Sequence, residues 1–381
     1  MTLEKLMKLE SIRKRKRLLL EVQILLAVVL ILAIAMPLLL PAFRLKILGR
    51  ILSLAIVALG IDLIWGYTGL LSLGHGIFFA LGGYAFAMYL NLQLPQGQLP
   101  EFFSLYGVSK LPWFWQPFYS FPFTMVAIIL IPGIVAGLLG YLIFRNRIRG
   151  VYFSILTQAA LLVFFNFFNG QQKLINGTNG LKTDTQAIFG VLASSAGAQI
   201  AFYEFTILLV VLTYLLCRWL TSGRFGRLLV AIRDDEVRTR FSGYDPTGFK
   251  VLVFAISGAI AGISGALYTV QTGIITPKAM DVAFSIEMVI WVAVGGRATL
   301  VGPIIGTLLV RWAQTLLSER FPEVWLFFQG ALFLIVVTVL PDGILGGLNQ
   351  LRSQLGFRPR LVTYPSIEEA PEVQKEREEI G

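Results

Sequence analysis

The sequence predicts an all-α integral membrane protein with about ten membrane-spanning helices. Hydrophobic residues make up 56% of the 381-residue chain and charged residues only 14%, whereas a soluble globular protein averages roughly 45–50% and 25%. The mean hydropathy is +0.74. Several long runs contain no Asp, Glu, Lys or Arg: 22–43, 63–100, 111–144, 150–172 and 251–277. Each is long enough to cross the ~30 Å hydrocarbon layer, which takes roughly 20 apolar residues as a helix.

The crossings are defined by apolar runs and by the Gly, Pro and charged residues that interrupt them. A basic segment, 1–17, comes first and resembles the start of a signal peptide. The apolar run after it exceeds the roughly 7–15 residues of a signal core, which favours a retained first helix. The eighth crossing is the shortest and carries Glu287. Crossings are predicted at 18–40, 47–66, 70–92, 122–144, 149–168, 201–220, 250–271, 282–297, 299–318 and 325–345.

The distribution of basic residues predicts which side of the membrane each loop faces. With the N-terminus in the cytoplasm, the inside segments contain 23 Lys and Arg and the outside segments contain 8. Basic residues are retained on the cytoplasmic side during insertion, so this asymmetry supports both termini being cytoplasmic. Arg44, Lys46 and Arg50 fall outside and disagree with the pattern. The net charge of +10 is explained by this bias and requires no nucleic-acid partner.

The whole chain divides into one membrane domain and two flanking segments. The membrane region 18–345 lies between the basic segment 1–17 and a charged tail, 346–381, whose Glu-rich end predicts disorder. An aromatic-rich outer loop, 93–121, indicates either an interfacial aromatic belt or a partner-docking surface. A second outer loop, 169–200, is rich in Gly, Asn, Ser and Gln and predicts irregular structure.

Two segments in the predicted membrane region are interrupted by glycine. The first reads GYTGLLSLGHG over 66–76, and the second reads GGRATLVGPIIG over 295–306. They occupy comparable places in the two halves of the chain. Unwound backbone is tolerated in a membrane where it lines a cavity, so such breaks point to a transport path. The candidate path residues are Thr68, Ser72, Gly74, His75, Gly76 and Glu287.

His75, the only histidine, has two interpretations. It either packs and hydrogen-bonds inside the bundle or lines the path as a donor or acceptor. Ionisable groups within spans are costly and are therefore functional candidates. Asp62 and Glu204 are expected near the membrane interfaces, where a bland role is favoured. Glu287 and Arg311 are expected deeper, where they either serve the path or pair with each other.

A charged segment, 222–246, contrasts with the apolar chain around it. Four of its apolar residues are expected to share one strip of a short helix that ends before Pro246: Leu228, Leu229, Ile232 and Phe241. Such a helix either rests on an anionic membrane surface or docks a cytoplasmic partner through its mixed charges. The residues assigned to this docking role are Arg224, Arg227, Leu228, Ile232, Arg233, Asp234, Asp235, Glu236, Phe241 and Gly243.

Other chemistries find little support in the sequence. One cysteine and one histidine leave no internal disulfide and no His/Cys metal cluster. The stretch NGTNGLKT over 176–183 lacks the Gly-Lys-Ser/Thr of a phosphate-binding loop, so the chain is not expected to bind ATP itself. No nucleophile–base pair is evident, which makes a membrane enzyme the least favoured class.

Four stretches resemble the membrane permeases of ABC importers for branched-chain amino acids and urea, and among them most closely the larger urea-type permeases. These are GYTGLLSLGHGIFFALGGYA from position 66, RDDEVRTRFSGYD from 233, AFSIEMVIWVAVGGRATLVGPIIG from 283, and VLPDGILG from 339. The resemblance covers about 45–350. The loop 222–246 departs from the EAA motif of type I importers. The tail from 366 onward lies beyond the resemblance.

The resemblance implies a type II ABC importer permease fold of about ten helices in the bacterial cytoplasmic (inner) membrane. Such a permease works with a sister permease subunit, two cytoplasmic ATPase subunits that use ATP, and an extracytoplasmic substrate-binding protein. The loop after the sixth helix is the coupling segment of that fold, and here it is 222–246. No cofactor or metal is implied for this chain.

Three functions remain open at this stage. The leading one is urea import by alternating access, since a small neutral solute needs hydrogen-bond partners and no counter-ion. The second is import of branched-chain amino acids or short amides, for which Glu287 and Arg311 offer opposite charges. The third, from another class, is an ATP-independent urea carrier or channel. The coupling segment argues against the third, because a channel needs no cytoplasmic motor.

Overall fold

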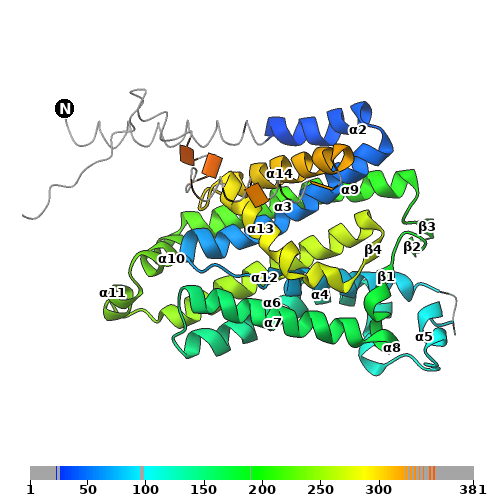
Figure 1. Ribbon diagram of the computed structural model, residues 1–381, viewed down its shortest axis with the longest axis horizontal. Coiled ribbons are helices and arrows are strands. Elements are labelled where there is room, and N and C mark those ends of the chain that lie inside the picture. Colours follow the sequence, from blue (N-terminus) through cyan, green and yellow to red (C-terminus); the bar gives the residue numbers. More distant parts are fainter. Residues whose placement is uncertain are drawn as a thin grey trace, which may run out of the picture.

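The computed structural model describes residues 26–94, 98–188 and 190–321, together with residue 23 and scattered positions between 323 and 347. Long helices lie side by side along the long axis of the molecule, with α10 and α11 at one end and α5, α8 and the short strands at the other (Figure 1). The segment 1–17, most of the tenth predicted crossing and nearly all of the 346–381 tail lie outside the described residues.

The long helices coincide with the predicted crossings from the second to the ninth. They are α3 Ala42–Thr68, α4 His75–Asn91, α6 Phe121–Arg145, α7 Val151–Gly170, α9 Ala196–Ser222, α12 Pro246–Thr272, α13 Val282–Gly295 and α14 Val301–Arg320. The first crossing is represented by an apolar helical stretch, Leu26–Leu39, with the π-helical turn η1 Ile31–Ala35 and α2 Met36–Leu39.

Within the described part of the chain, five helices are long and apolar enough to cross a membrane: α3, α6, α7, α9 and α12. Two shorter apolar helices, Leu26–Leu39 and Val282–Gly295, accompany them. The chain is therefore a mostly helical protein with several apolar spans, whereas the count of ten stays a prediction.

Short elements cap the two ends of the bundle. At one end lie α10 Arg224–Asp234 and α11 Glu236–Phe241. The other short elements are α5 Glu101–Leu105, η2 Trp113–Tyr119, α8 Gln172–Ile175, η3 Gly177–Asn179, β1 Leu181–Lys182, β2 Ala187–Ile188, β3 Val191–Leu192, β4 Ile274–Ile275 and η4 Pro277–Met280. β1 pairs with β4 antiparallel, with Leu181 opposite Ile275, and β2 pairs with β3. The purely irregular structure predicted for 169–200 is therefore wrong in part.

The centre of the bundle is formed by α3 and α12. In the most apolar stretch of α3, 94% of the residues are buried inside the chain, against 61% in α12 and 22–33% in α6, α7 and α9. Ser257 and Ser264 of α12 donate to the carbonyls of Gly60 and Ser53 of α3 at 2.5 and 2.6 Å. Lipid gives apolar side chains no reason to associate, so such small hydroxyl residues supply the helix contact instead.

Two helix starts differ from the sequence expectation, each for a local reason. α3 begins at Ala42, so Arg44, Lys46 and Arg50 lie on a helix rather than in an outer loop. Arg44 pairs there with Glu319 of α14 at 3.1 Å, which accounts for a cation that the charge asymmetry left unexplained. α4 begins at His75 instead of near 70, because Gly69 takes a left-handed conformation (φ 72°) and ends α3.

Candidate functional site

Within the first glycine-interrupted segment, 66–76, residues 69–74 form a non-helical link between α3 and α4 that neighbouring hydroxyl groups contact. Ser154 of α7 donates to the carbonyl of Leu71 at 2.6 Å. The Leu73 N–H donates to the Thr157 hydroxyl at 3.1 Å, and the Gly76 N–H donates to Ser285 of α13 at 3.3 Å. Its backbone is thus satisfied by neutral side chains from α7 and α13, as unwound backbone in a membrane requires.

Ser72 and Thr68 also lie inside this region. Ser72 is buried and its hydroxyl accepts from the Gly74 N–H at 3.3 Å. Thr68 is buried in the last turn of α3 and donates to the carbonyl of Ile64 at 2.6 Å. Both hydroxyls therefore serve the chain's own backbone.

His75 opens α4 and is 1% exposed. Its Nε2 lies 2.7 Å from the Ser257 hydroxyl, which also lies 2.5 Å from the Gly60 carbonyl oxygen. The ring lies between Phe78 and Phe254, with centroids 5.7 and 5.9 Å away in edge-on geometry. His75 thus ties α4 to α12 and α3, which favours the packing interpretation over the path-lining one.

Gly74 and Gly76 are in close contact with neighbouring elements. A Cβ added at Gly74 would lie 2.7 Å from the Thr157 carbonyl oxygen, and one at Gly76 would lie 2.7 Å from the Ser285 hydroxyl. Both distances are too short for a real Cβ. Because glycine has no side chain, these two positions permit close helix packing, whatever further role the segment has.

The second glycine-interrupted segment forms the turn between α13 and α14. Gly295 and Gly306 lie so close to the facing backbone that a Cβ would overlap the carbonyl oxygens of Gly302 and Trp291, respectively. Ala298 and Leu300 adopt positive φ angles of 58° and 57°, which non-glycine residues rarely adopt and which cost on the order of 1–3 kcal/mol per residue. This turn therefore needs partners that hold it.

Asp62 supplies those partners from α3. Its side chain is fully buried, and its two oxygens accept from the Ala298 and Leu300 N–H groups at 2.6 and 3.1 Å. Thr299 closes the turn from within by donating to the Gly296 carbonyl at 2.7 Å. The expected place of Asp62 near a membrane interface stays a prediction, whereas the structure shows its side chain buried against a turn far along the chain.

The two glycine-interrupted segments meet at the C-terminal end of α3. A Cβ at Gly66 would lie 2.6 Å from the Ala298 nitrogen, so the second segment touches the start of the first. Arg233 of α10 reaches the same place and donates to the Gly66 carbonyl at 2.8 Å. The structure thus brings both segments and the charged segment 222–246 together at one end of the bundle.

Glu287 stands apart from this cluster. It pairs with Arg311 of α14 at 3.2 Å, and Arg311 also donates to Gln314 at 2.6 Å and lies over the Trp291 ring. The expectation that Glu287 and Arg311 pair with each other is confirmed. Their charges are therefore neutralised between α13 and α14.

The charged segment contains two short helices instead of one. Asp235 has extended backbone and caps α11 by accepting from the Arg238 N–H at 2.9 Å, which ends α10. Leu229 and Ile232 are buried in the chain, whereas Phe241 is 88% exposed. The prediction of one shared apolar strip is wrong, because the break at Asp235 turns α11 away from α10.

The other residues assigned to docking divide by exposure. Glu236 is held inward: it pairs with Lys250 of α12 at 3.1 Å, with Arg149 at 3.1 Å and with Arg240 at 3.4 Å. Leu228 and Asp235 are half-buried. The residues left on the surface are Arg224, Arg227, Arg233, Asp234, Phe241 and Gly243, with Val237 and Tyr244 beside them.

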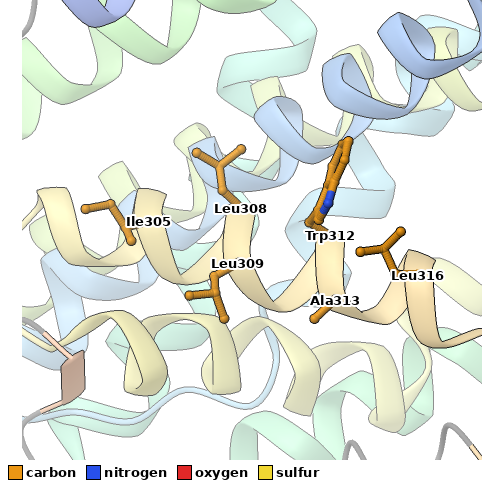
Figure 2. A pocket seen from close by; sticks show the side chains of 6 residues that line it. All are labelled: Ile305, Leu308, Leu309, Trp312, Ala313 and Leu316. Atoms are coloured by element: carbon orange, nitrogen blue, oxygen red, sulfur yellow. The ribbon is translucent and has the colours of Figure 1, made fainter.

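An apolar hollow of about 500 Å³ lies along one face of α14 (Figure 2). Six side chains at helical spacing line it: Ile305, Leu308, Leu309, Trp312, Ala313 and Leu316. A polar solute finds almost no hydrogen-bond partners on this face. It suits lipid or another apolar helix.

Sequence reasoning missed the residues that hold the site together. The side chain of Lys250 is 2% exposed and pairs with Glu236. In the sequence, however, Lys250 was counted only as one more cytoplasmic cation. Ser257 gives no sequence signal for its place between His75 and Gly60. Asp62, the one charge in the run from 51 to 100, was noted as an ionisable residue of a predicted span, but its partners in the α13–α14 turn were not predicted.

Comparison with known proteins places this sequence in a transport family. The family model for the branched-chain amino acid transport system permease component matches residues 43–337. The chain therefore belongs to this family of ABC importer permeases.

Among curated relatives, the high-affinity branched-chain amino acid permease LivM of Salmonella typhimurium is 27% identical, covering 76% of this chain and 67% of that protein. A probable LivM of Methanocaldococcus jannaschii is 24% identical, covering 76% and 89%. The ribose import permease RbsC of Haemophilus influenzae is 22% identical, covering 59% and 69%. No solved structure matches the chain.

Proposed function

We propose that this chain is the permease subunit of an ATP-driven importer that carries urea. It forms the translocation path with a sister permease in the bacterial cytoplasmic membrane. Two ATPase subunits bind the end that carries α10 and α11, which is the cytoplasmic end, and a substrate-binding protein delivers the solute at the other. ATP is used by the ATPase subunits, and this chain itself carries no cofactor.

The neutral surroundings of the first glycine-interrupted segment support urea as the solute. The hydrogen bonds that residues 71–76 make to other helices go to serine and threonine hydroxyls of α7, α12 and α13, and one of them involves the His75 ring. When the bundle opens there, these groups offer donors and acceptors to a neutral polar molecule. The charges of Glu287 and Arg311 are already paired with each other, so a zwitterion gains no counter-ion from them in this arrangement.

Branched-chain amino acids are the second candidate. Relatives that cover about three quarters of this chain carry that substrate in their names. The family also includes a ribose permease, so membership alone leaves the solute open. Selection by the substrate-binding protein is a further reason why relatives with similar permeases transport different solutes.

Uptake by the reconstituted complex tests both candidates. The tagged chain is purified with its sister permease and ATPases, placed in proteoliposomes, and supplied with the binding protein, ATP and labelled urea. We expect ATP-dependent urea accumulation that unlabelled leucine does not compete away. Leucine accumulation without urea accumulation would favour the second candidate, and uptake of either solute without ATP would contradict the importer.

The ATPase contact is tested at Phe241, the most exposed apolar residue of the coupling segment 222–246. Phe241→Asp is expected to leave the permease pair intact but to reduce ATPase association at least tenfold, as burial of a large aromatic anchor predicts. Trp113→Asp, at an 80% exposed aromatic residue of η2 at the opposite end, serves as the matched control. Ile232→Asp is unsuitable because Ile232 is 4% exposed and its replacement damages the chain's own packing.

Orientation is tested with two exposed positions at opposite ends of the bundle, Asn179 and Arg238. A cysteine at Asn179 is expected to react with an impermeant maleimide in intact cells. A cysteine at Arg238 is expected to react only after permeabilisation. The reverse result would invert the proposed topology.

A further inference from the structure

We propose that Asp62 is a positioning residue that passes movement of the coupling segment on to the α13–α14 turn. The proposal rests on the proposed function, because only a permease driven by ATPase subunits needs such a link. It assigns a role in transport to a buried carboxylate that contacts neither the solute nor the ATPase.

The α13–α14 turn is attached to the last two turns of α3 by polar contacts. Asp62 accepts from the N–H groups of Ala298 and Leu300. The Tyr67 hydroxyl donates to the Ala298 carbonyl at 3.4 Å, and the Arg297 guanidinium lies 5.4 Å from the centre of the Trp65 ring. Because the turn is bonded to α3 through directional contacts, displacement of that helix end displaces the turn.

The coupling segment contacts the same C-terminal end of α3 through Arg233. Arg233 of α10 donates to the Gly66 carbonyl at 2.8 Å, and its stem lies against Gly69, where a Cβ would be 3.0 Å from the Arg233 Cγ. A Cβ at Gly66 would lie 2.5 Å from an Asp62 oxygen. Gly66 thus lies between the arginine of the coupling segment and the carboxylate that holds the turn.

A carboxylate is the side chain that suits this position. Both of its oxygens accept, so it satisfies two N–H groups at once, whereas an asparagine presents an N–H₂ group to one of them. The turn it holds contains two non-glycine residues with positive φ angles, which persist only where surrounding contacts fix them. Loss of one contact therefore frees the turn from α3 without emptying the core.

The test compares Asp62→Asn and Arg233→Met in the reconstituted complex. Both variants are expected to lower the solute imported per ATP about tenfold, the size expected when a hydrogen bond to a charged group is lost. Asp62→Asn is expected to keep ATP hydrolysis, whereas ATPase association is measured in parallel for Arg233→Met because Arg233 lies in the coupling segment. Arg233→Lys keeps a donor and is expected to retain most of the coupling. Because both residues lie on one link, the double variant is expected to be no worse than either single one.

A second readout follows the turn itself. A cysteine placed at the exposed position 301, which begins α14 directly after the turn, with the buried Cys217 replaced by serine, is labelled with maleimide with and without ATP. The parent complex is expected to change its labelling rate on ATP binding, and both Asp62→Asn and Arg233→Met are expected to abolish that change. Neither effect follows from a purely structural role of Asp62.

Several outcomes would overturn the proposal. These are normal coupling in Asp62→Asn, additive losses in the double variant, or an ATP-dependent labelling change that persists in Arg233→Met. If Asp62→Asn fails to assemble, Arg233→Met alone decides, since its side chain is on the surface. Uptake by the parent complex that needs no ATP would instead contradict the proposed function, so the two failures are distinguishable.

Discussion

The two glycine-interrupted segments look alike in sequence but are held in different ways. The first, 69–76, is bonded mainly by neutral hydroxyls from α7, α12 and α13, at distances of 2.6 to 3.3 Å. The second, the turn at 295–300, is bonded by the carboxylate of Asp62 and packed backbone against backbone at Gly295 and Gly306. The first segment therefore has several neutral partners that can be exchanged. The second segment depends on a small number of contacts that are hard to replace.

This difference indicates what each segment is suited to do. Hydroxyl groups can exchange a backbone partner for a small polar solute at little cost, since the net value of one neutral hydrogen bond is about 1 kcal/mol. A buried carboxylate with two backbone donors exchanges far less readily, because an unpaired buried charge is costly. The first segment is thus suited to contact solute, and the second to transmit movement.

The largest expected effect comes from adding one methyl group to the second segment. In Gly306→Ala the new Cβ overlaps the Trp291 carbonyl, and the facing backbone cannot rotate away. We expect a loss of about 3 kcal/mol or more and little assembled complex, measured by thermal unfolding in detergent and by yield.

Two further alanine variants calibrate that result. Gly74→Ala, whose Cβ meets the Thr157 carbonyl at 2.7 Å, is expected to lose about 1–3 kcal/mol. Gly137→Ala has an ordinary contact of 3.5 Å with Ala255 and serves as the control. A greater loss in Gly74→Ala than in Gly306→Ala would reverse the comparison between the segments.

The next effect concerns His75, which we expect to act through packing. His75→Ala leaves a hole between Phe78 and Phe254 and removes the partner of Ser257. We expect a stability loss of about 2–3 kcal/mol, with uptake falling only in proportion to the assembled complex. A stable complex with reduced urea uptake would instead restore the path-lining interpretation. Ser257→Ala, which removes the bond with little volume, separates the two contributions.

A smaller effect is expected inside the second segment. Thr299 donates to the Gly296 carbonyl and accepts from the Gly302 N–H at 3.0 Å. Thr299→Val removes both bonds at nearly constant shape, and we expect a loss of about 1–2 kcal/mol in thermal unfolding. Thr299→Ser keeps the hydroxyl and should behave like the parent. Equal melting of Thr299→Val and the parent would show that the contacts with α3 hold the turn without Thr299.

The helices were predictable from the sequence because membrane crossing demands a long apolar run, and this demand is local. The starts of α3 and α4 were not, since α3 begins directly after the extended Pro41 and α4 follows the left-handed Gly69 that ends α3. The break at Asp235 was missed because an Asp in a run of charged residues can be either an ordinary surface charge or the cap of a new helix. The sequence alone does not distinguish the two.

The candidate site was predictable only as a list of positions. Both glycine-interrupted segments were identified, but their meeting at the end of α3 depends on contacts such as Asp62 with Ala298, which are 236 positions apart. Burial of Lys250 and Glu236 likewise depends on how α11 folds back onto α12. A single sequence shows which groups are costly to bury, whereas the partner that makes burial tolerable is a property of the fold.

The smallest expected effect falls on the bond that we consider most exchangeable. The Gly76 N–H reaches the Ser285 hydroxyl at 3.3 Å, longer than a strong N–H···O bond. Ser285→Ala should therefore cost only about 0.5 kcal/mol in thermal unfolding, against about 1 kcal/mol for Ser154→Ala, whose bond to Leu71 is 2.6 Å. If the Ser285 hydroxyl is exchanged for solute during transport, Ser285→Ala should also lower urea uptake several-fold while the melting temperature barely changes. Uptake equal to that of the parent would place Ser285 among the packing residues and narrow the solute contacts to α7 and α12.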